Sequence, residues 1–494
     1  MKKTFICALL GVLSINVLSA VELVPTDQLL ASYLEKDSDL KNQALELQKA
    51  KLNQQSTQID KGISIKLQTG DMTFTFGDNN SFSVKPGASV TIPQANNLGL
   101  NVNSQLSVKD GKTNFDSASA TVSVDVISAN KANREISLLQ QERKVLEAER
   151  SLTSKALEKE KTFYKNLSNL LNNITSVLSK KATVFDDNVS FEKIKLQGYS
   201  KDSASYVRAE LKLFTSQRDY EAAVHSLIND YKAFYLDCGR EIEIPEDTDF
   251  TQLIPTDIVQ VEAVDITSFD KSKYKDIESN EWTQEINQMS RDASTKFTLT
   301  ANGGYSYRNT NGTASNSVNA GLSGTYEGLG VSASVSVPVS SSSSGTGSAA
   351  GGAATGAGAG SMGGTSSNSP TLTVGITWTP TTSKKNKISD QLEEISIQQE
   401  NMKIESAYSS YETTVQERQL KLEDILWNIQ SNQTNLEMYE KVEENMKSYY
   451  DRGLISEKDY SSACNSTVQA KVKQISGYID LIIYNNEVSA MFVE

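Results

Sequence analysis

The residue types that most often carry catalysis are scarce in this sequence. The one histidine, His225, lies in a predicted helix with Tyr220, Leu227 and Tyr231 nearby. With one histidine there is no HExxH zinc site, and nothing indicates a Ser-His-Asp triad or a Cys-His pair. We therefore expect His225 to make a helix–helix contact. We predict a protein that is not an enzyme, with no catalytic residue and no cofactor.

The other ligand and nucleophile types do not cluster either. Cys7 belongs to the N-terminal apolar run, and Cys238 and Cys464 lie in no CxxC or other metal-ligand spacing. We expect these two cysteines to be small helix-packing residues and predict no metal site. The carboxylates are abundant but sit among basic residues, which is typical of solvated helix surfaces.

A sharp turn near the C-terminus is the most specific local pattern. The stretch "DRGLISEKDYSSACNSTV" spans residues 451–468. Gly453 predicts a left-handed helix C-cap, and Ser456 and Asp459 have the spacing of a capping box. Two long polar helices should therefore meet there in a reversal of the chain.

The N-terminus and the charge limit the class of protein. Residues 1–20 have a basic start, an apolar run and small residues at the end, which predicts an export signal. The formal net charge is −13, so a nucleic-acid partner is not expected. After Val21 no run approaches the roughly 20 apolar residues of a membrane-spanning helix. Any membrane-spanning part must therefore consist of β-strands.

The chain repeats one order of elements twice. In the first repeat (21–239), a helix at 27–58 precedes a region of period two from Gly62 to Ser128. A helix of about 50 residues follows at 129–178, and the sequence "LQGYSKD" leads into a helix at 203–236. Helix, strands, long helix, glycine turn and helix thus form the unit.

The second repeat (270–494) follows a mixed linker at 240–269 that contains Pro245 and Pro255. It comprises a helix at 270–293, strands at 296–308 and 370–380, and a helix from Asn386 to Arg452. Gly198 and Gly453 occupy matching places, which gives a period of about 255 residues. A Ser/Gly/Ala-rich segment at 340–369 is interpreted as a flexible loop at the rim of a barrel.

The strands have two different faces. In 370–380 the apolar residues Leu372, Val374, Ile376 and Trp378 alternate with Thr and Gly. A wall between lipid and water gives this pattern, and so does a half-buried soluble sheet. Trp378 would lie in the aromatic girdle at the periplasmic interface.

The first strand region changes phase at "TGD" (69–71). Ile63, Ile65 and Leu67 are odd-numbered, whereas Met72, Phe74 and Phe76 are even-numbered, so we expect a β-bulge or a tight turn there. Four further strand-like runs are interpreted as inserted hairpins that rise from the outer rim. They are "SFSVKPGASVTI", "LGLNVNSQLSV", "SVNAGLSGTY" and "GVSASVSVPV".

This interpretation leaves four wall strands per chain, with a larger number left open. Four strands cannot close a barrel, so identical copies must complete it. The long helices are too polar to bury a core within one chain, because Ile136, Leu139 and Leu146 mix with Arg143 and Glu147. Such helices pair along a narrow seam or line water.

The sequence resembles the TolC-type outer-membrane efflux and export channels over the whole mature chain. The most specific part is "YYDRGLISEKDYSSACNSTVQAKVKQISGYIDLIIYNNEV" (449–488), which matches the family's Gly-x-x-(Ser/Thr)-x-x-Asp turn. The stretch 196–239 is a weaker match. The resemblance implies an α+β fold in a homotrimer, in which antiparallel helical hairpins form a periplasmic tunnel below a twelve-stranded barrel. The protein would sit in the outer-membrane lipid of a diderm bacterium, with a periplasmic adaptor and an inner-membrane pump as partners.

The resemblance also suggests site residues. Asp459 matches an entrance aspartate that narrows the pore, and Tyr450 a tyrosine that holds the mouth closed. The sequence departs from the family at Ser462, where a second acid is expected, and at Ile455, where an arginine is expected. Two turns would dock the adaptor: Gly198, Tyr199 and Ser200, and Gly453, Leu454, Ile455 and Ser456.

Two other classes of protein share some of these features. A secreted or surface-attached trimeric coiled-coil stalk with β-rich heads would also have acidic helices, alternating strands and a Gly/Ser loop. It does not need helices that double back twice. A periplasmic solute-binding protein would need alternating α/β units, which the sequence lacks.

Overall fold

A computed structural model of the chain describes residues 23–75, 81–109, 112–245, 248–294, 297–310, 313–340 and 370–493. The predicted export signal and residues 341–369 of the Ser/Gly/Ala-rich loop lie outside these ranges. Within them, no helix is both long enough and apolar enough to cross a membrane. The chain forms two compact units, each built from separated segments. One combines Met1–Glu46, Glu149–Lys275 and Tyr408–Glu494, and the other combines Leu47–Ala148 and Asp276–Ala407.

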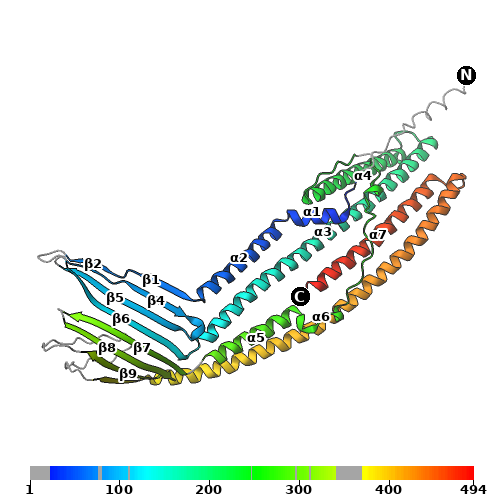
Figure 1. Ribbon diagram of the computed structural model, residues 1–494. Helices are drawn as coiled ribbons and strands as arrows, with labels where there is room; N and C mark the ends of the chain where they lie inside the picture. The colour runs from blue at the N-terminus through cyan, green and yellow to red at the C-terminus, as the bar shows by residue number, and fades with distance from the viewer. Residues whose placement is uncertain are drawn as a thin grey trace. The chain divides into compact units, whose positions relative to one another are not determined.

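The second unit contains a single antiparallel sheet of ten strands (Figure 1). Strands of the first repeat occupy the region predicted from Gly62 to Ser128, and the predicted strands at 296–308 and 370–380 are also present. The strands are β1 (Ser64–Gln68), β2 (Met72–Thr75), β3 (Ser81–Val84), β4 (Gly87–Ile92), β5 (Leu98–Lys109), β6 (Lys112–Ile127), β7 (Phe297–Thr310), β8 (Thr313–Tyr326), β9 (Leu329–Ser340) and β10 (Thr371–Trp378).

The ten strands are arranged as a meander of eight, because two of the eight are each interrupted and so count as two strands. β1 pairs with β4 and β2 pairs with β3, while β3 and β4 both pair with β5 along its length. β1 and β2 therefore form one interrupted strand, and β3 and β4 form a second. From β5 the order continues through β6, β7, β8 and β9 to β10. Each repeat contributes four members, and β6 joins β7 between the repeats.

This topology corrects the expectation of inserted hairpins. β4, β5, β8 and β9 lie within the sheet, and the larger number of strands that the sequence left open is the one found. β7 pairs with β8 over the whole of β7, and β10 pairs with β9. The alternating pattern identified the strands, but it contains no information about which strand pairs with which.

The predicted phase change at residues 69–71 is confirmed as a break between β1 and β2. Gly70 has φ +65°, and a Cβ there would lie 1.9 Å from the backbone oxygen of Lys85. Only glycine fits this position. After the break, Met72 and Phe74 continue the face to which Ile65 and Leu67 belong.

The helices of the sheet-containing unit are joined by buried ion pairs. α3 (Asn130–Leu196) and α5 (Lys275–Ala293) are linked by Arg143, whose two terminal nitrogens both bond the carboxylate of Glu278. α5 is linked to α6 (Pro380–Asp451) by Arg291, whose Nη2 lies 3.1 Å from Oε2 of the buried Glu400. These charged contacts and a small apolar cluster of Ile136, Ile286 and Ala293 hold the helices together.

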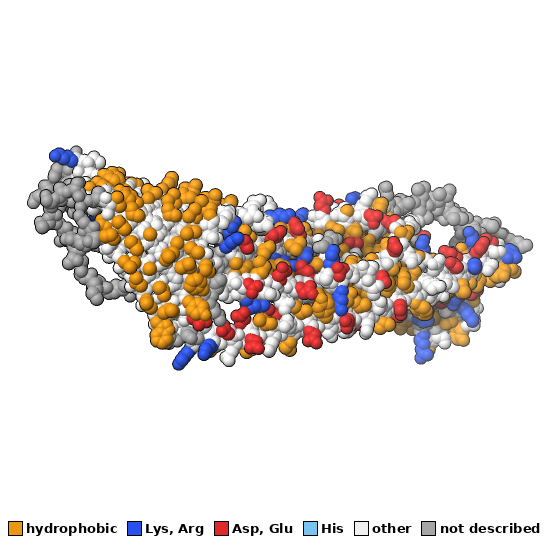
Figure 2. Space-filling view, turned by 60° about the horizontal axis from the view of Figure 1, so that its bottom comes forward, with side chains coloured by type: hydrophobic (Ala, Val, Ile, Leu, Met, Phe, Trp, Pro, Cys, Tyr) orange, Lys and Arg blue, Asp and Glu red, His pale blue; other side chains and the backbone are white. Residues whose placement is uncertain are grey.

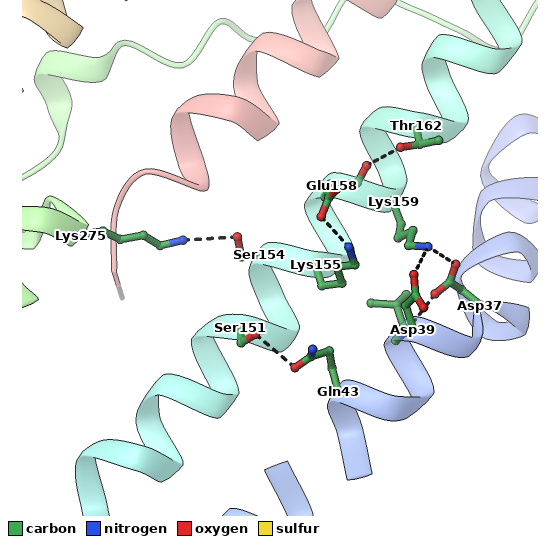
Figure 3. A network of polar contacts seen from close by, with 11 residues as sticks. Asp37, Asp39, Gln43, Ser151, Ser154, Lys155, Glu158, Lys159, Thr162 and Lys275 are labelled. Atoms are coloured by element: carbon green, nitrogen blue, oxygen red, sulfur yellow. Dashed lines mark hydrogen bonds and ion pairs between the residues drawn. The ribbon is translucent and has the colours of Figure 1, made fainter. Parts of the chain in front are cut away.

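The N-terminal helix predicted at 27–58 is two helices. α1 (Thr26–Lys36) ends where Asp37 leaves helical geometry, and α2 (Ser38–Asp60) follows directly. The Asp37 carboxylate accepts from the backbone N–H of Leu40 and pairs with Lys159 of α3 at 2.7 Å. Asp39 approaches Lys159 at the same distance, and Ser151 bonds Gln43 one turn further along (Figure 3). The break therefore coincides with the point where α3 is bound.

The helical unit has the larger apolar core, so the expectation that the long helices are too polar to bury a core within one chain is wrong for this unit. α3, α4 (Ala204–Asp237) and α7 (Glu457–Ser489) bury side chains against the segment 240–269. The hydroxyl of the buried Tyr231 donates to the backbone oxygen of Leu253, and Asn485 bonds the backbone at Glu262 and Val264. Segment 240–269 is therefore packed against the helices rather than merely connecting the repeats.

One carboxylate ties three helices of this unit together. Glu487 of α7 is bonded by Lys161 of α3 and by Arg418 and Lys421 of α6. Burial raises the pKa of the Glu487 carboxyl, but the bonds from Lys161, Lys421 and Arg418 outweigh burial and lower this pKa to about 2. A carboxylate that stays ionised here stabilises the folded chain.

The two predicted helix reversals have matching geometry. Gly198 and Gly453 have φ +75° and +70°, so both are left-handed. At the second turn the backbone N–H of Gly453 bonds the oxygen of Tyr450, and that of Leu454 bonds Tyr449, which is a Schellman motif. No atom lies within 4 Å of a Cβ built on either glycine. Backbone conformation is therefore what selects glycine at both turns.

Replacing Glu487 with glutamine should destabilise the protein most at neutral pH. The wild-type carboxylate makes its full contribution to the free energy of unfolding above its unfolded-state pKa of about 4.5. This contribution is lost as the pH falls through the folded-state pKa of about 2. We expect E487Q to lose roughly 1–3 kcal/mol of unfolding free energy near neutral pH. The difference from wild type should shrink toward zero on acidification.

Urea unfolding of the purified protein, followed by far-UV circular dichroism across this pH range, measures the effect. E440Q, a change at an exposed residue of α6, serves as the control. A pH-independent loss, or a loss no greater than that of E440Q, would contradict the assignment.

Replacing Gly198 or Gly453 with alanine should lower the free energy of unfolding by about 1–2 kcal/mol in each case, because a residue with a Cβ is strained in the left-handed region. Asparagine tolerates this region better, so G453N and G198N should be less destabilised than the alanine variants. Thermal unfolding of the four variants tests this. Equal midpoints for alanine and asparagine at the same turn would rule out backbone strain as the cause.

Candidate functional site

The register of the sheet places its large apolar side chains on one face, here called the apolar face. Every strand pair obeys this rule, from Ile65 opposite Val90 to Trp378 opposite Leu329. Its main members in the eight-strand path are Ile65 and Leu67; Ala88, Val90 and Ile92; Leu98, Leu100, Val102, Leu106 and Val108; Phe115, Ala118, Ala120, Val122 and Val124; Phe297, Leu299, Ala301, Tyr305 and Tyr307; Val318, Ala320, Leu322 and Tyr326; Leu329, Val331, Ala333, Val335 and Val337; Leu372, Val374, Ile376 and Trp378.

The apolar face is uncovered. Leu322 is 53% exposed, Val374 60% and Trp378 70%, and Figure 2 shows hydrophobic side chains gathered over the strands. None of the paired residues on this face is Asp, Glu, Lys or Arg. An apolar area this large and free of charge marks a surface that meets another apolar phase.

The opposite face, here called the polar face, carries mostly small neutral side chains, and its charged members in the first six strands are Lys66, Lys109, Lys112 and Asp125. Across β7 to β10 it consists of Ser, Thr, Asn and Gly, apart from Arg308 at the far end of β7 and Pro338 in β9. Its glycines lie beneath polar side chains of the next strand. A Cβ on Gly321 would lie 2.8 Å from Oδ1 of Asn302, and one on Gly375 would lie 2.8 Å from Oγ of Ser332. The polar side chains therefore lie flat, and the face is shallow.

Aromatic residues mark both ends of the apolar face. At the end nearest the helices, Phe297 is opposite Tyr326, and Trp378 is opposite Leu329, which also pairs with Tyr326. At the far end, Phe115 packs on Tyr307 with ring centroids 5.5 Å apart, and Phe74 on Phe82 at 4.7 Å. Phe297 and Tyr307 are ten residues apart on β7, or about 34 Å at 3.4 Å per residue.

The two outer strands of the sheet each have an open edge, and each helix joined to them exposes a row of apolar side chains. β1 and β10 pair on one side only within the described residues. α2 leads into β1 and exposes Leu45, Leu52 and Ile59 at seven-residue spacing. α6 follows β10 and exposes Ile388, Ile395 and Met402 at the same spacing. Seven-residue rows of this kind are typical of helices that pair with another helix.

The two helix turns lie near the same end of the helical unit. Asp186 and Asp187, near the end of α3, contact different partners. Asp187 pairs with Lys212 of α4 at 2.7 Å, and Asp186 pairs with Lys458, just after the second turn, at 3.0 Å. Tyr199 and Leu454 at the turns are 48% and 66% exposed. The Asp186–Lys458 pair thus places the turn at Gly453, Leu454, Ile455 and Ser456 beside the end of α3, which leads into the turn at Gly198, Tyr199 and Ser200.

Asp459 closes the capping box expected from the sequence. Its backbone N–H donates to Oγ of Ser456 at 3.2 Å, and its carboxylate accepts from the hydroxyl and the backbone N–H of Ser456. These bonds, the hydroxyl bond foremost, lower the pKa of the Asp459 carboxyl. The side chain is exposed and charged at neutral pH, so a cap and an electrostatic role are compatible.

Tyr450 stacks on Tyr460 of α7, with ring centroids 5.2 Å apart and ring planes 14° apart. Arg452 lies over the ring of Tyr449 at 5.3 Å and bonds Ser448, so its guanidinium is held on its own helix. At the first turn, Phe191 and Tyr206 pack edge to face at 5.1 Å. Aromatic contacts between the paired helices therefore hold both turns.

His225 does not make the helix–helix contact expected from the sequence. It is exposed, and its ring Nδ1 lies 3.1 Å from Nδ2 of Asn229 on the same helix. The buried stripe of α4 runs instead through Val224, Leu227, Ile228 and Tyr231. Cys238 is buried and Cys464 half-buried, and neither forms a disulfide. In the described ranges no three His, Cys, Asp or Glu side chains gather as a metal site would require.

Sequence analysis missed two parts of this site. It did not assign the apolar positions of β4, β5, β8 and β9 to the main face, although their alternation was visible. It also missed the pair Asp186–Lys458, because the helix predicted at 129–178 ended before Asp186, whereas α3 continues to Leu196. The part of α3 beyond residue 178 makes three contacts with other helices. Phe191 packs on Tyr206, Asp187 pairs with Lys212, and Asp186 pairs with Lys458.

The chain is similar to several solved structures of membrane proteins, among them a transmembrane channel, an outer membrane protein and an outer membrane channel. CusC is 13% identical, with 97% of this chain and 96% of that chain covered and a TM-score of 0.44. VceC from Vibrio cholerae is 10% identical, with 95% and 97% covered and a TM-score of 0.45. The CmeC outer membrane channel of Campylobacter jejuni is 12% identical, with 95% and 86% covered and a TM-score of 0.43.

No curated protein matches the sequence. Family models match both halves of it: residues 29–258 match the TP096X N-terminal domain and residues 259–494 match the TP096X C-terminal domain. The boundary falls inside the packed segment 240–269, between the two repeats. With both domains present in order, the chain belongs to the TP096X family.

Proposed function

We propose that the protein is an outer-membrane export channel whose wall is built from several copies of the chain. The observation that carries this proposal is the apolar face, which is continuous, free of charge and bounded by two aromatic rows. A transmembrane β-wall needs an apolar band about 25 Å tall between aromatic girdles. The spacing from Phe297 to Tyr307 is about 34 Å along the strand, and a strand tilt of roughly 35–45° reduces its height to about 24–28 Å.

The two faces together favour a pore wall over a soluble head domain. A soluble sheet covers its apolar face with a second layer, whereas Leu322, Val374 and Trp378 are more than half exposed. A polar face of Ser, Thr, Asn and Gly suits contact with water in a lumen. A coiled-coil stalk with β-rich heads would require neither property.

Association of copies follows from the open sheet and not from the number of strands. Eight strands are enough to close a small barrel, but side chains would fill it. β1 of one copy and β10 of the next can instead pair, and the exposed rows of α2 and α6 can pack beside them. We propose a homotrimer on the family resemblance, with the long helices continuing the wall as a periplasmic tunnel.

The helix turns would form the inner end of this tunnel. The exposed Tyr199 and Leu454 are suited to bind a periplasmic adaptor that serves an inner-membrane pump. Asp459 of each copy would contribute to a ring of carboxylates at the entrance. Asp459 has no second acid three residues later, where Ser462 stands, so the ring would be weaker than one built from two acids per copy.

The location can be tested by extraction of membranes from cells that express the chain. We expect the protein to stay in the outer-membrane fraction in high salt, because apolar contact with lipid does not weaken with ionic strength. Detergent should release it as an oligomer, as judged by light scattering. Release by salt alone as a dissolved single copy would overturn the proposal.

The entrance role of Asp459 can be tested by single-channel recording in planar bilayers. D459N removes the charge and keeps a hydrogen-bonding side chain. We expect it to raise the conductance up to about twofold and to weaken block by trivalent cations roughly tenfold, because like charges at the entrance bind such cations.

S456A is the matched control, since it removes the hydroxyl of the same cap and leaves the carboxylate. It should leave cation block within about twofold of wild type. If D459N and S456A change block equally, or if neither changes it, Asp459 is only a helix cap.

A further inference from the structure

We propose that β4, β5, β8 and β9 are wall strands within the membrane, so that each copy supplies eight strands rather than four. This inference rests on the proposed function. It concerns the segments that the sequence suggested were hairpins outside the membrane. Its consequence is a wider pore at the level of the sheet.

The pairing of the second repeat gives the first argument. If β8 and β9 formed a hairpin above the rim, β7 and β10 would pair with each other below it. They do not pair: β7 lies between β6 and β8, and β10 pairs with β9 alone. All 14 residues of β7 have partners in β8, and all eight of β10 have partners in β9. β8 and β9 therefore separate the two helix-linked strands along their whole length.

The side chains of β8 and β9 give the second argument. Val318 and Leu322 of β8 and Val331 and Val335 of β9 lie on the apolar face and are 39–53% exposed. Between them stand Ser, Asn, Thr and Gly on the polar face. Tyr326 at the start of the β8–β9 hairpin belongs to the same aromatic row as Phe297 and Trp378. A hairpin in water would have no reason to keep one face free of charge.

The first repeat agrees with the second. β5 and β4 continue the apolar face with Leu100 opposite Val90 and Val102 opposite Ala88. Asn101, Asn103 and Thr91 occupy the polar face of the same strands. The break at Gly70 preserves the arrangement at the outer edge, because it returns Met72 and Phe74 to the apolar face. Both repeats thus supply four members with the same two-faced pattern.

The width of the wall follows from the number of strands. Barrel diameter grows roughly linearly with strand number. For three copies, eight strands each at roughly 4.8 Å spacing give a circumference of about 115 Å before tilt, against about 58 Å for four strands each. The shallow polar face adds little obstruction, because its glycines let neighbouring side chains lie flat. The charged residues of the polar face, which are Lys66, Lys109, Lys112, Asp125 and Arg308 in each copy, would add electrostatic selection to this limit on size.

Single cysteines can test which strands are in the membrane. Cys7, Cys238 and Cys464 are first replaced with alanine. V335C and S334C then probe the two faces of β9. L372C and T373C, which are their Cα partners in β10, are the matched controls. Labelling rates with a charged, membrane-impermeant maleimide are measured on the full-length protein in proteoliposomes, for variants retained in the membrane through high salt.

We expect S334C to react about tenfold or more faster than V335C, and T373C to exceed L372C to a similar degree. If the β10 pair differs but V335C and S334C react equally fast, β9 lies outside the membrane and the inference is wrong, while the channel remains supported. If neither pair differs, both the inference and the proposed function fail.

Discussion

Side-chain alternation is the constraint on which the sheet depends. Successive residues point to opposite faces, so a slip of one residue would move a whole strand's apolar set to the polar face. The irregular positions act against such slips. Gly70 separates β1 from β2, and register shifts lie between Gln105 and Leu106 in β5 and between Asp125 and Ile127 in β6. Each absorbs extra residues and leaves the apolar side chains on one face, so these interruptions preserve the two-faced wall.

The sequence predicted features that depend on neighbouring residues. The capping box of Ser456 and Asp459 spans three positions, and the left-handed glycines at 198 and 453 are single positions. The phase change at 69–71 is a short-range pattern, and all of these are present. Strand order is different, because a strand with two faces can pair with any other such strand. The order of the eight-strand meander therefore depends on three-dimensional pairing, and the prediction that β8 and β9 are hairpins outside the sheet is wrong.

The errors in the helices have a similar cause. The helix predicted at 129–178 ends before a stretch that contains the β-branched residues Thr183, Val184 and Val189, which lower helix propensity. Tertiary contacts through Asp187 and Phe191 overcome that preference up to Leu196. The helix–helix contact predicted for His225 rests only on its sequence neighbours Tyr220, Leu227 and Tyr231. The spacing of Val224, Leu227, Ile228 and Tyr231 already defined a buried stripe, and His225 lies outside it.

The uncovered surfaces of the sheet-containing unit converge on two segments of the chain. α2 runs into β1, and β10 runs into α6, so each segment carries an open strand edge followed or preceded by an exposed apolar row. An open edge alone invites pairing with any strand, and an exposed row alone invites any helix. A partner that satisfies both must offer a strand and a helix in the same order. The opposite flank of an identical chain does so, which makes each flank specific for the other and favours a closed ring over indiscriminate association.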